Sequence, residues 1–302
     1  MLFHRNFLGY TGGHGKVFDY YQHALAHAGW QPVVWFRHGA EHRDNPWRQH
    51  AVPGETLWRP DAADALFLAG RDWQSYPEDI PGVPVINLVQ HVRHADPHSP
   101  AHAFLGRRAV RICVSHAVAD AIRSTGRVNG PVEVIEAALR MPASLLPPSR
   151  RHGVFIGALK QQALGRELAR RLIAAGHAVD LCDNFVARDD YLRRMGSADI
   201  AVLLPNVTEG FYLPALEAMA LGCATVVPDC IGNRAYLQPE RNALTPLLHV
   251  DSLVAAVERL REASLAAALR HAGRETADRF SLESERAAFH RILDRLHLLW
   301  QP

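Results

Sequence analysis

The chain has 302 residues, of which 48% are hydrophobic and 21% charged, a composition typical of a globular protein with room for two domains. The formal net charge of +2, with 18 histidines counted as neutral, makes no electrostatic case for a nucleic-acid partner. Four cysteines occur without a C-x-x-C pair (Cys113, Cys182, Cys223 and Cys230). Reduced thiols are expected, and neither a disulfide framework nor a zinc site.

The sequence also predicts a soluble, cytoplasmic protein. Its first residues lack the apolar core of a signal peptide. No run reaches the roughly 20 apolar residues that a membrane span needs. A peripheral contact with the inner membrane agrees with both observations and is left open.

Strands and helices alternate in the first half of the chain. Residues 1–7 predict a strand, the glycine-rich GYTGGHGK predicts a turn, and residues 16–29 have the apolar spacing of a helix. This order opens a βαβ unit and therefore a parallel sheet. Further buried strands are expected at residues 31–36, 63–70, 84–90, 110–115 and 132–137, with a helix at 115–126.

A second alternating set follows the proline-rich stretch MPASLLPPSRRHG, residues 141–153, which is interpreted as a linker. Two doubly wound α/β domains are therefore predicted, at residues 1–148 and 149–281. The second set comprises expected strands at residues 153–160, 177–184, 198–205 and 223–229, expected helices at 167–176 and 214–222, and a helical run from 251 to 300.

The stretch TEGFYLPALEAMALG, residues 208–222, carries the strongest chemical pattern. Glu209 lies in a loop at the carboxyl end of a predicted strand, where open α/β sheets bind ligands. Pro214 suits the first turn of the following helix, whose N-terminus favours an anion such as a diphosphate. The simpler interpretation is that Glu217 complements the helix dipole and that Glu209 is a solvated loop residue. The residues alone leave both interpretations open.

Glu-x7-Glu within E-G-F-x-L-P-x-L-E-A-M-A-x-G resembles the signature of family 4 retaining glycosyltransferases. The similarity continues in order along the chain, through residues 11–35, 87–91, 110–122 and 198–210. The resemblance implies the GT-B fold, with two facing Rossmann-like domains and the active site in the interdomain cleft. It places the nucleotide-sugar mainly on the second domain and the acceptor on the first. The last helix, residues 282–302, would pack back on the first domain.

The resemblance also implies roles for single residues. Glu217 would accept hydrogen bonds from the nucleotide's ribose, and Glu209 would contact donor-sugar hydroxyls. His91, at the end of a predicted strand, would act near the reacting centre; an ordinary loop histidine is the alternative. The loop of Gly210, Phe211, Tyr212 and Leu213 would bind sugar and phosphate oxygens through its backbone.

The donor phosphates would be approached by Gly12 and Gly13 of the glycine-rich stretch, with His14 and Lys16 as polar contacts. A plain tight turn is the competing interpretation. The family's diphosphate-binding arginine is replaced here by Ala158. Lys160 or Arg166 would substitute for it; otherwise the diphosphate would bind more weakly, or a third group would compensate.

Taken together, the predicted activity is retaining transfer of a hexosyl group from a UDP- or GDP-sugar to an acceptor hydroxyl, in bacterial surface-glycan or glycoconjugate synthesis. No cofactor is expected, because the nucleotide-sugar is the donor substrate. No metal is expected either, because prolines interrupt the histidine-rich stretch HVRHADPHSPAH and no ligand set completes it. The acceptor would be a glycan, a lipid-linked sugar or a small molecule. The alternatives are a non-catalytic sugar-nucleotide-binding protein and another GT-B enzyme, such as a nucleotide-sugar epimerase.

Overall fold

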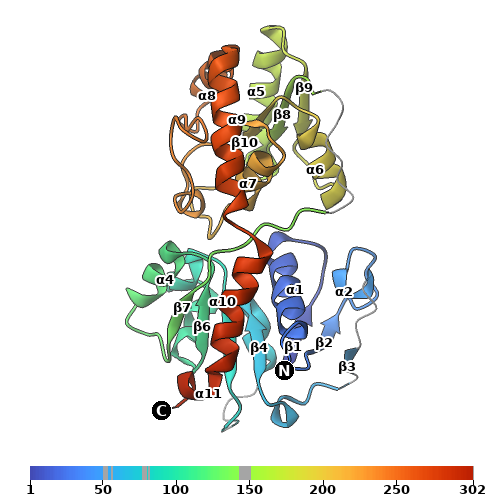
Figure 1. Ribbon diagram of the computed structural model, residues 1–302, viewed down its shortest axis with the longest axis vertical. Coiled ribbons are helices and arrows are strands. Elements are labelled where there is room, and N and C mark those ends of the chain that lie inside the picture. Colours follow the sequence, from blue (N-terminus) through green and yellow to red (C-terminus); the bar gives the residue numbers. More distant parts are fainter. Residues whose placement is uncertain (50–53, 56, 77–79, 81, 143–150, 302) are drawn as a thin grey trace. The chain divides into compact units, whose positions relative to one another are not determined.

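The computed structural model describes residues 1–49, 54–55, 57–76, 80, 82–142 and 151–301 (Figure 1). The chain divides into two compact units. The first is Met1–Ala137 together with Leu282–Pro302, and the second is Ala138–Ser281. Most of the predicted linker, residues 143–150, lies outside the described residues.

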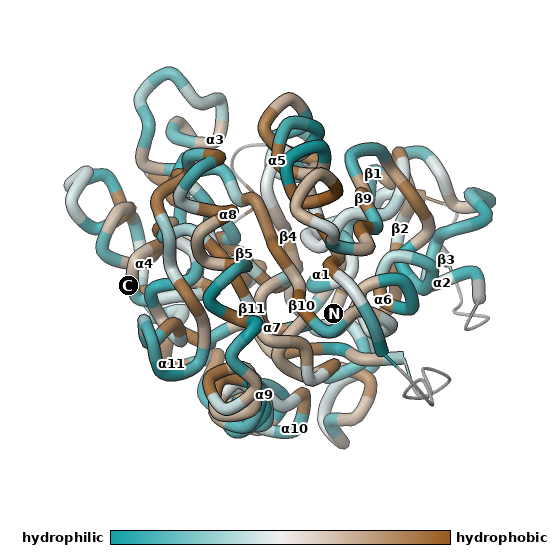
Figure 2. Tube along the Cα trace, turned by 90° about the horizontal axis from the view of Figure 1, so that it is seen from above, coloured by the Kyte–Doolittle hydropathy of each residue, from teal (hydrophilic) through white to brown (hydrophobic). Residues whose placement is uncertain are grey.

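The described part of the first unit contains a sheet of seven parallel strands in the order β3-β2-β1-β4-β5-β6-β7. Buried apolar runs form its central strands; β4, for example, is Leu-Phe-Leu-Ala, hydrophobic in the colouring of Figure 2, and all four of its residues are buried. Strands with two buried faces need such runs. The strands are β1 (Leu2–Asn6), β2 (Val33–His38), β3 (Gly54–Glu55), β4 (Leu66–Ala69), β5 (Val85–Val89), β6 (Val110–Cys113) and β7 (Val132–Val134).

Helix α1 (Gly12–Leu25) begins earlier than the sequence predicted, so the expected glycine-rich turn is largely the first turn of this helix. The physical reason is the cap: the Thr11 side chain accepts a hydrogen bond from His14 N at 3.2 Å. The unit's other helices are α2 (Pro46–Gln49), α3 (Pro100–Ala103), α4 (His116–Arg123), α10 (Leu282–Asp294) and α11 (Leu296–Leu299), with 3-10 turns η1 (Pro60–Ala62), η2 (Gly70–Ser75), η3 (Val92–Ala95) and η4 (Phe104–Gly106).

A buried group of charged side chains joins α10 to α1. Lys16 Nζ lies 2.7 Å from Asp19 Oδ2 and 2.9 Å from Glu285 Oε1, and His23 Nε2 lies 2.9 Å from Glu285 Oε2. All four side chains are nearly inaccessible to solvent. The Tyr20 ring also meets the Phe289 ring edge-on, at 4.9 Å between centroids. These contacts place the C-terminal segment in the first unit.

The second unit contains, within its described residues, a sheet of four parallel strands in the order β11-β10-β8-β9. Helices α5 and α6 lie between its strands as the chain runs, and α6 was not predicted. The strands are β8 (Val154–Gly157), β9 (Val179–Cys182), β10 (Ile200–Leu203) and β11 (Ala224–Val226); the helices are α5 (Gln162–Ala174), α6 (Arg188–Gly196), α7 (Leu213–Ala220), α8 (Val250–Arg259) and α9 (Ala263–Asp278), with the 3-10 turn η5 (Ile231–Asn233).

Candidate functional site

Each sheet has a point where the order of its strands reverses, and open α/β sheets bind ligands at the carboxyl edge of such a point. In the second unit the chain passes from β8 to β9 on one side and then to β10 on the other, so the reversal lies between β8 and β10. Lys160 follows β8 and Glu209 follows β10. The Lys160 Nζ and Glu209 Oε1 atoms are 2.6 Å apart. Two residues predicted for the donor site are thus brought together.

Glu209 is held firmly in this position. Glu209 is only 7% exposed. Its Oε1 accepts a hydrogen bond from Asn206 N at 3.1 Å in addition to the one from Lys160. The Lys160 side chain is 38% exposed and its ammonium lies 5.3 Å from the centre of the buried Tyr212 ring. Solvent therefore reaches this ion pair from the lysine side, and an incoming anion would meet the ammonium first.

The loop leading into α7 is braced by the segment around η5. Tyr212 N donates to Gly232 O at 2.9 Å, and the Tyr236 hydroxyl donates to Tyr212 O. Leu213 N donates to Phe211 O at 3.2 Å. The amides of Tyr212 and Leu213 thus have partners within the protein, and a bound donor would have to replace those partners to use them.

Glu217 lies in α7 and is 2% exposed. Arg188 Nη1, at the start of α6, lies 2.6 Å from its Oε1, so the buried carboxylate is ion-paired with this arginine. Arg188 Nη2 donates to Arg140 O at 2.9 Å. Arg188 is not recognisable from the sequence as a site residue, because α6 itself is not predicted and no motif connects this arginine to Glu217.

Two other predicted phosphate contacts are engaged elsewhere. The buried Lys16 ammonium is ion-paired with Asp19 and Glu285, and reaching a phosphate would require breaking those pairs. Burial would lower the pKa of Lys16, but the two carboxylates outweigh it and raise that pKa. Arg166 Nε lies 2.6 Å from Asp183 Oδ2 on the exposed start of α5.

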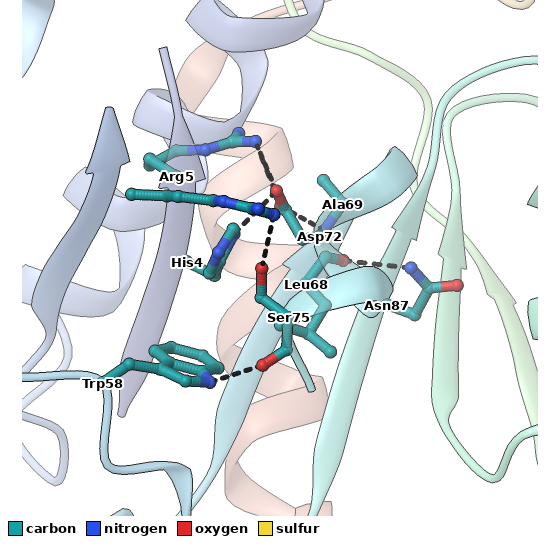
Figure 3. Close-up of polar contacts among 9 residues, drawn as sticks. His4, Arg5, Trp58, Leu68, Ala69, Asp72, Ser75 and Asn87 are labelled. Atoms are coloured by element: carbon teal, nitrogen blue, oxygen red, sulfur yellow. Dashed lines mark hydrogen bonds and ion pairs between the residues drawn. The ribbon is translucent and has the colours of Figure 1, made fainter. Parts of the chain in front are cut away.

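The first unit's sheet reverses between β1 and β4. A pocket of about 370 Å³ opens there, and Gly13 and His14 of α1 line it; Gly12, beside them, is exposed. Other lining residues, His4, Arg5 and Asp72, were missed because nothing in the sequence connects residues of β1 with those after β4 (Figure 3). His91 caps η3 after β5, where its Nδ1 accepts a hydrogen bond from Arg93 N at 3.0 Å.

Two half-buried histidines of the first unit have a strongly lowered pKa. Burial, assisted by Arg5, lowers the pKa of His14 to about 4. Burial, with His91, Arg93 and Arg111 nearby, lowers the pKa of His94 to about 4 as well. Both imidazoles are therefore neutral at pH 7, and the fold opposes their protonation.

Acidification from pH 7 to 4.5 is expected to destabilise the first unit partly through these histidines. An unfolded histidine has a pKa near 6.5, whereas these two have a pKa of about 4 in the folded protein. Between pH 6.5 and pH 4 the unfolded state therefore binds more protons than the folded state, and the free energy of unfolding falls as the pH is lowered. We expect about 1–3 kcal/mol per histidine. Urea unfolding at both pH values measures the loss. The double variant His14→Gln, His94→Gln should lose less, and an unchanged loss would contradict this origin.

Among the described residues, no group of three or more histidine, cysteine or acidic side chains is arranged to hold a metal ion. The same residues include no helix long and apolar enough to cross a membrane. His94, His98 and His102 lie in or beside the short η3 and α3 elements, separated by two prolines.

Comparison with known proteins finds one family model that matches part of the sequence. Residues 124–263 match the family model described as Glycosyl transferases group 1. No curated protein sequence matches the chain.

Solved structures match over almost the whole length. A glycosyltransferase from Rickettsia africae has 12% identity and a TM-score of 0.74, with 98% of both chains covered. Anabaena Alr3699/HepE in complex with UDP-glucose has 15% identity and a TM-score of 0.72, covering 97% of this chain and 98% of that one. WaaG, a glycosyltransferase of lipopolysaccharide biosynthesis, has 13% identity and a TM-score of 0.64, covering 96% and 98%. These matches confirm the predicted fold: two Rossmann-like α/β domains, as in GT-B glycosyltransferases.

Proposed function

We propose that this protein is a retaining glycosyltransferase that moves a hexosyl group from a UDP- or GDP-sugar to an acceptor hydroxyl. The observation that carries the proposal is the pair of Lys160 and Glu209 at the strand reversal of the second unit, beside the start of α7. The match of residues 124–263 to group 1 glycosyltransferases supports it. So do the structures of a similar fold in complex with UDP and UDP-glucose.

Donor binding would exchange partners at this ion pair. A diphosphate is a stronger acceptor for the Lys160 ammonium than a single carboxylate, because it carries more charge. The exposed ammonium would turn to the diphosphate, and Glu209 would then accept hydrogen bonds from the donor sugar. The N-terminus of α7 would add its dipole to the phosphate charge. Glu217, whose Oε1 lies 2.6 Å from Arg188 Nη1, would accept hydrogen bonds from the ribose hydroxyls while it stays paired with this arginine.

The chemistry assigned to this site needs no protein nucleophile. The acceptor oxygen would attack the anomeric carbon on the face from which the diphosphate leaves, through an oxocarbenium-like transition state. The leaving phosphate oxygen would take the acceptor's proton. The protein's contribution would be positioning and charge stabilisation, with His91 hydrogen-bonded near the reacting centre. We place the enzyme on the cytoplasmic side of bacterial surface-glycan or glycoconjugate synthesis, acting without a metal.

The first test is calorimetric titration with UDP, GDP, ADP and their sugar conjugates, with and without divalent metal. One nucleotide should bind without metal, and Glu217→Gln should weaken its binding about 10- to 100-fold, since hydrogen bonds to a charged group contribute about 1.5–3 kcal/mol. Glu275→Gln, an exposed acid on α9, is the control and should bind normally.

The reaction is tested by measuring the release of nucleotide from the donor in the presence of candidate acceptors. NMR then gives the anomeric configuration of the product. An inverted product would overturn retention. Nucleotide binding without release or transfer would favour the non-catalytic alternative, to which the replacement of the usual arginine by Ala158 points. No binding of any nucleotide would overturn the proposal.

A further inference from the structure

The pocket at the strand reversal of the first unit is strongly basic. Arg5, Arg37 and Arg71 contribute three guanidinium groups to its lining, against the single carboxylate of Asp72. Arg5 and Asp72 are buried, whereas Arg37 and Arg71 are exposed at the rim. The pocket therefore presents a fixed basic floor and two adaptable basic side chains.

A buried network fixes the floor of the pocket. Arg5 Nη2 lies 3.0 Å from Asp72 Oδ2, and His4 Nδ1 lies 2.9 Å from Asp72 Oδ1 (Figure 3). Ala69 N donates to Asp72 Oδ2 at 2.9 Å. Asp72 thus has three partners, and its one charge is shared between an arginine and a histidine. A carboxylate so engaged does not neutralise the arginines at the rim.

Polar atoms at the floor also lack partners. Arg5 Nε and His4 Nε2 are buried without a hydrogen bond, although both residues line the pocket and are more than nine-tenths buried. Thr11, Gly13 and His14 add the start of the 14-residue helix α1 to the same pocket. Arg5 Nε is a buried donor without a partner, and a buried donor and a helix N-terminus both favour a negatively charged ligand.

The remaining lining is suited to a sugar. Asn6, Gln74, Ser75 and Gln90 provide amide and hydroxyl groups, which can both donate to and accept from sugar hydroxyls. A volume of about 370 Å³ is at the small end of the range of sites for small molecules, about 300–1,000 Å³. It is suited to a single sugar residue with a charged substituent.

We propose that this pocket binds the acceptor, and that the acceptor is a sugar bearing an anionic group, either a phosphate ester or a carboxylate. The inference rests on the proposed function, because only a transferase needs an acceptor. The anionic group would lie against Arg37, Arg71 and the start of α1. The donor's phosphates are assigned instead to Lys160, in the second unit.

Calorimetry with the full chain and no nucleotide tests this assignment. The probes are glucose 6-phosphate, glucuronate, inorganic phosphate and glucose. One or both anionic sugars should bind more tightly than inorganic phosphate and than neutral glucose, and which of the two binds identifies the anionic group. The double variant Arg37→Gln, Arg71→Gln should weaken that binding at least tenfold, because it removes charge-assisted hydrogen bonds.

Arg127→Gln is the matched control, since it removes one exposed charge from the same unit outside the pocket. It should leave binding unchanged, and all variants should bind the nucleotide as the wild type does. The proposal would be overturned if the double variant bound the anionic sugar as tightly as the wild type, or if neither anionic sugar bound. It would also be overturned if UDP displaced the bound anionic sugar by simple competition. Binding of a sugar phosphate by a protein that binds no nucleotide would overturn the transferase proposal while retaining the anion pocket.

Discussion

Replacing Lys16 by methionine is expected to destabilise the first unit by about 3–5 kcal/mol, because it leaves two buried carboxylates without their cation. Lys16 lies between Asp19 and Glu285, at 2.7 and 2.9 Å, and the Glu285 side chain has no exposed surface. Removing one partner of a buried pair costs much more than the pair's net contribution, since the remaining charge keeps its desolvation penalty. Urea unfolding followed by tryptophan fluorescence measures the change.

The matched control for Lys16→Met is Arg295→Met. Arg295 Nη2 lies 3.0 Å from Glu133 Oε1, so this pair also joins the C-terminal segment to the N-terminal part of the first unit. Its arginine is 49% exposed, and an exposed pair contributes roughly 0–1 kcal/mol. If the two variants lost similar stability, the buried group would not be what fixes α10 against α1.

Most strands could be predicted because their signal is local. A run such as Ile-Ala-Val-Leu in β10 is buried whatever the topology, and Ser115 marks the start of α4 by its own chemistry. Helix α6 was missed because its sequence, RDDYLRRMG, is mostly charged and buries little beyond Leu192 and Met195. The apolar period that would have indicated a helix is too weak there.

The candidate donor site was partly predictable for a related reason. Glu209 and Glu217 are in one short motif, and Lys160 follows a recognisable strand. The proximity of Arg188 to Glu217 and the formation of the pocket around Asp72 depend on which elements become neighbours in the fold. His4 and Asp72 are 68 positions apart, and only the placement of β4 next to β1 brings them within 2.9 Å. Such pairs become visible only once the topology is known.

Gly232→Ala is expected to reduce turnover of the bound nucleotide-sugar by about 10²-fold while leaving the protein folded. A Cβ atom at this position would lie 2.7 Å from Glu209 Cβ, closer than such atoms approach, and in a tight contact of 3.0 Å with Tyr212 N. Neither neighbour is the far end of a flexible side chain, so the loop itself must move. Because Tyr212 N is bonded to Gly232 O at 2.9 Å, the shift would pass to Glu209 and the start of α7.

The test compares Gly232→Ala with Gly106→Ala, where an added Cβ meets nothing within 4 Å. Circular dichroism and urea unfolding establish that both variants fold, and steady-state kinetics with the donor gives kcat and KM. If the glycine acts by positioning Glu209, then Gly232→Ala should cost much less in a Glu209→Gln background than in the wild type. Additive losses would assign the defect to another part of the loop. Full activity in a folded Gly232→Ala protein would show that the close approach of η5 does not position the carboxylate at all.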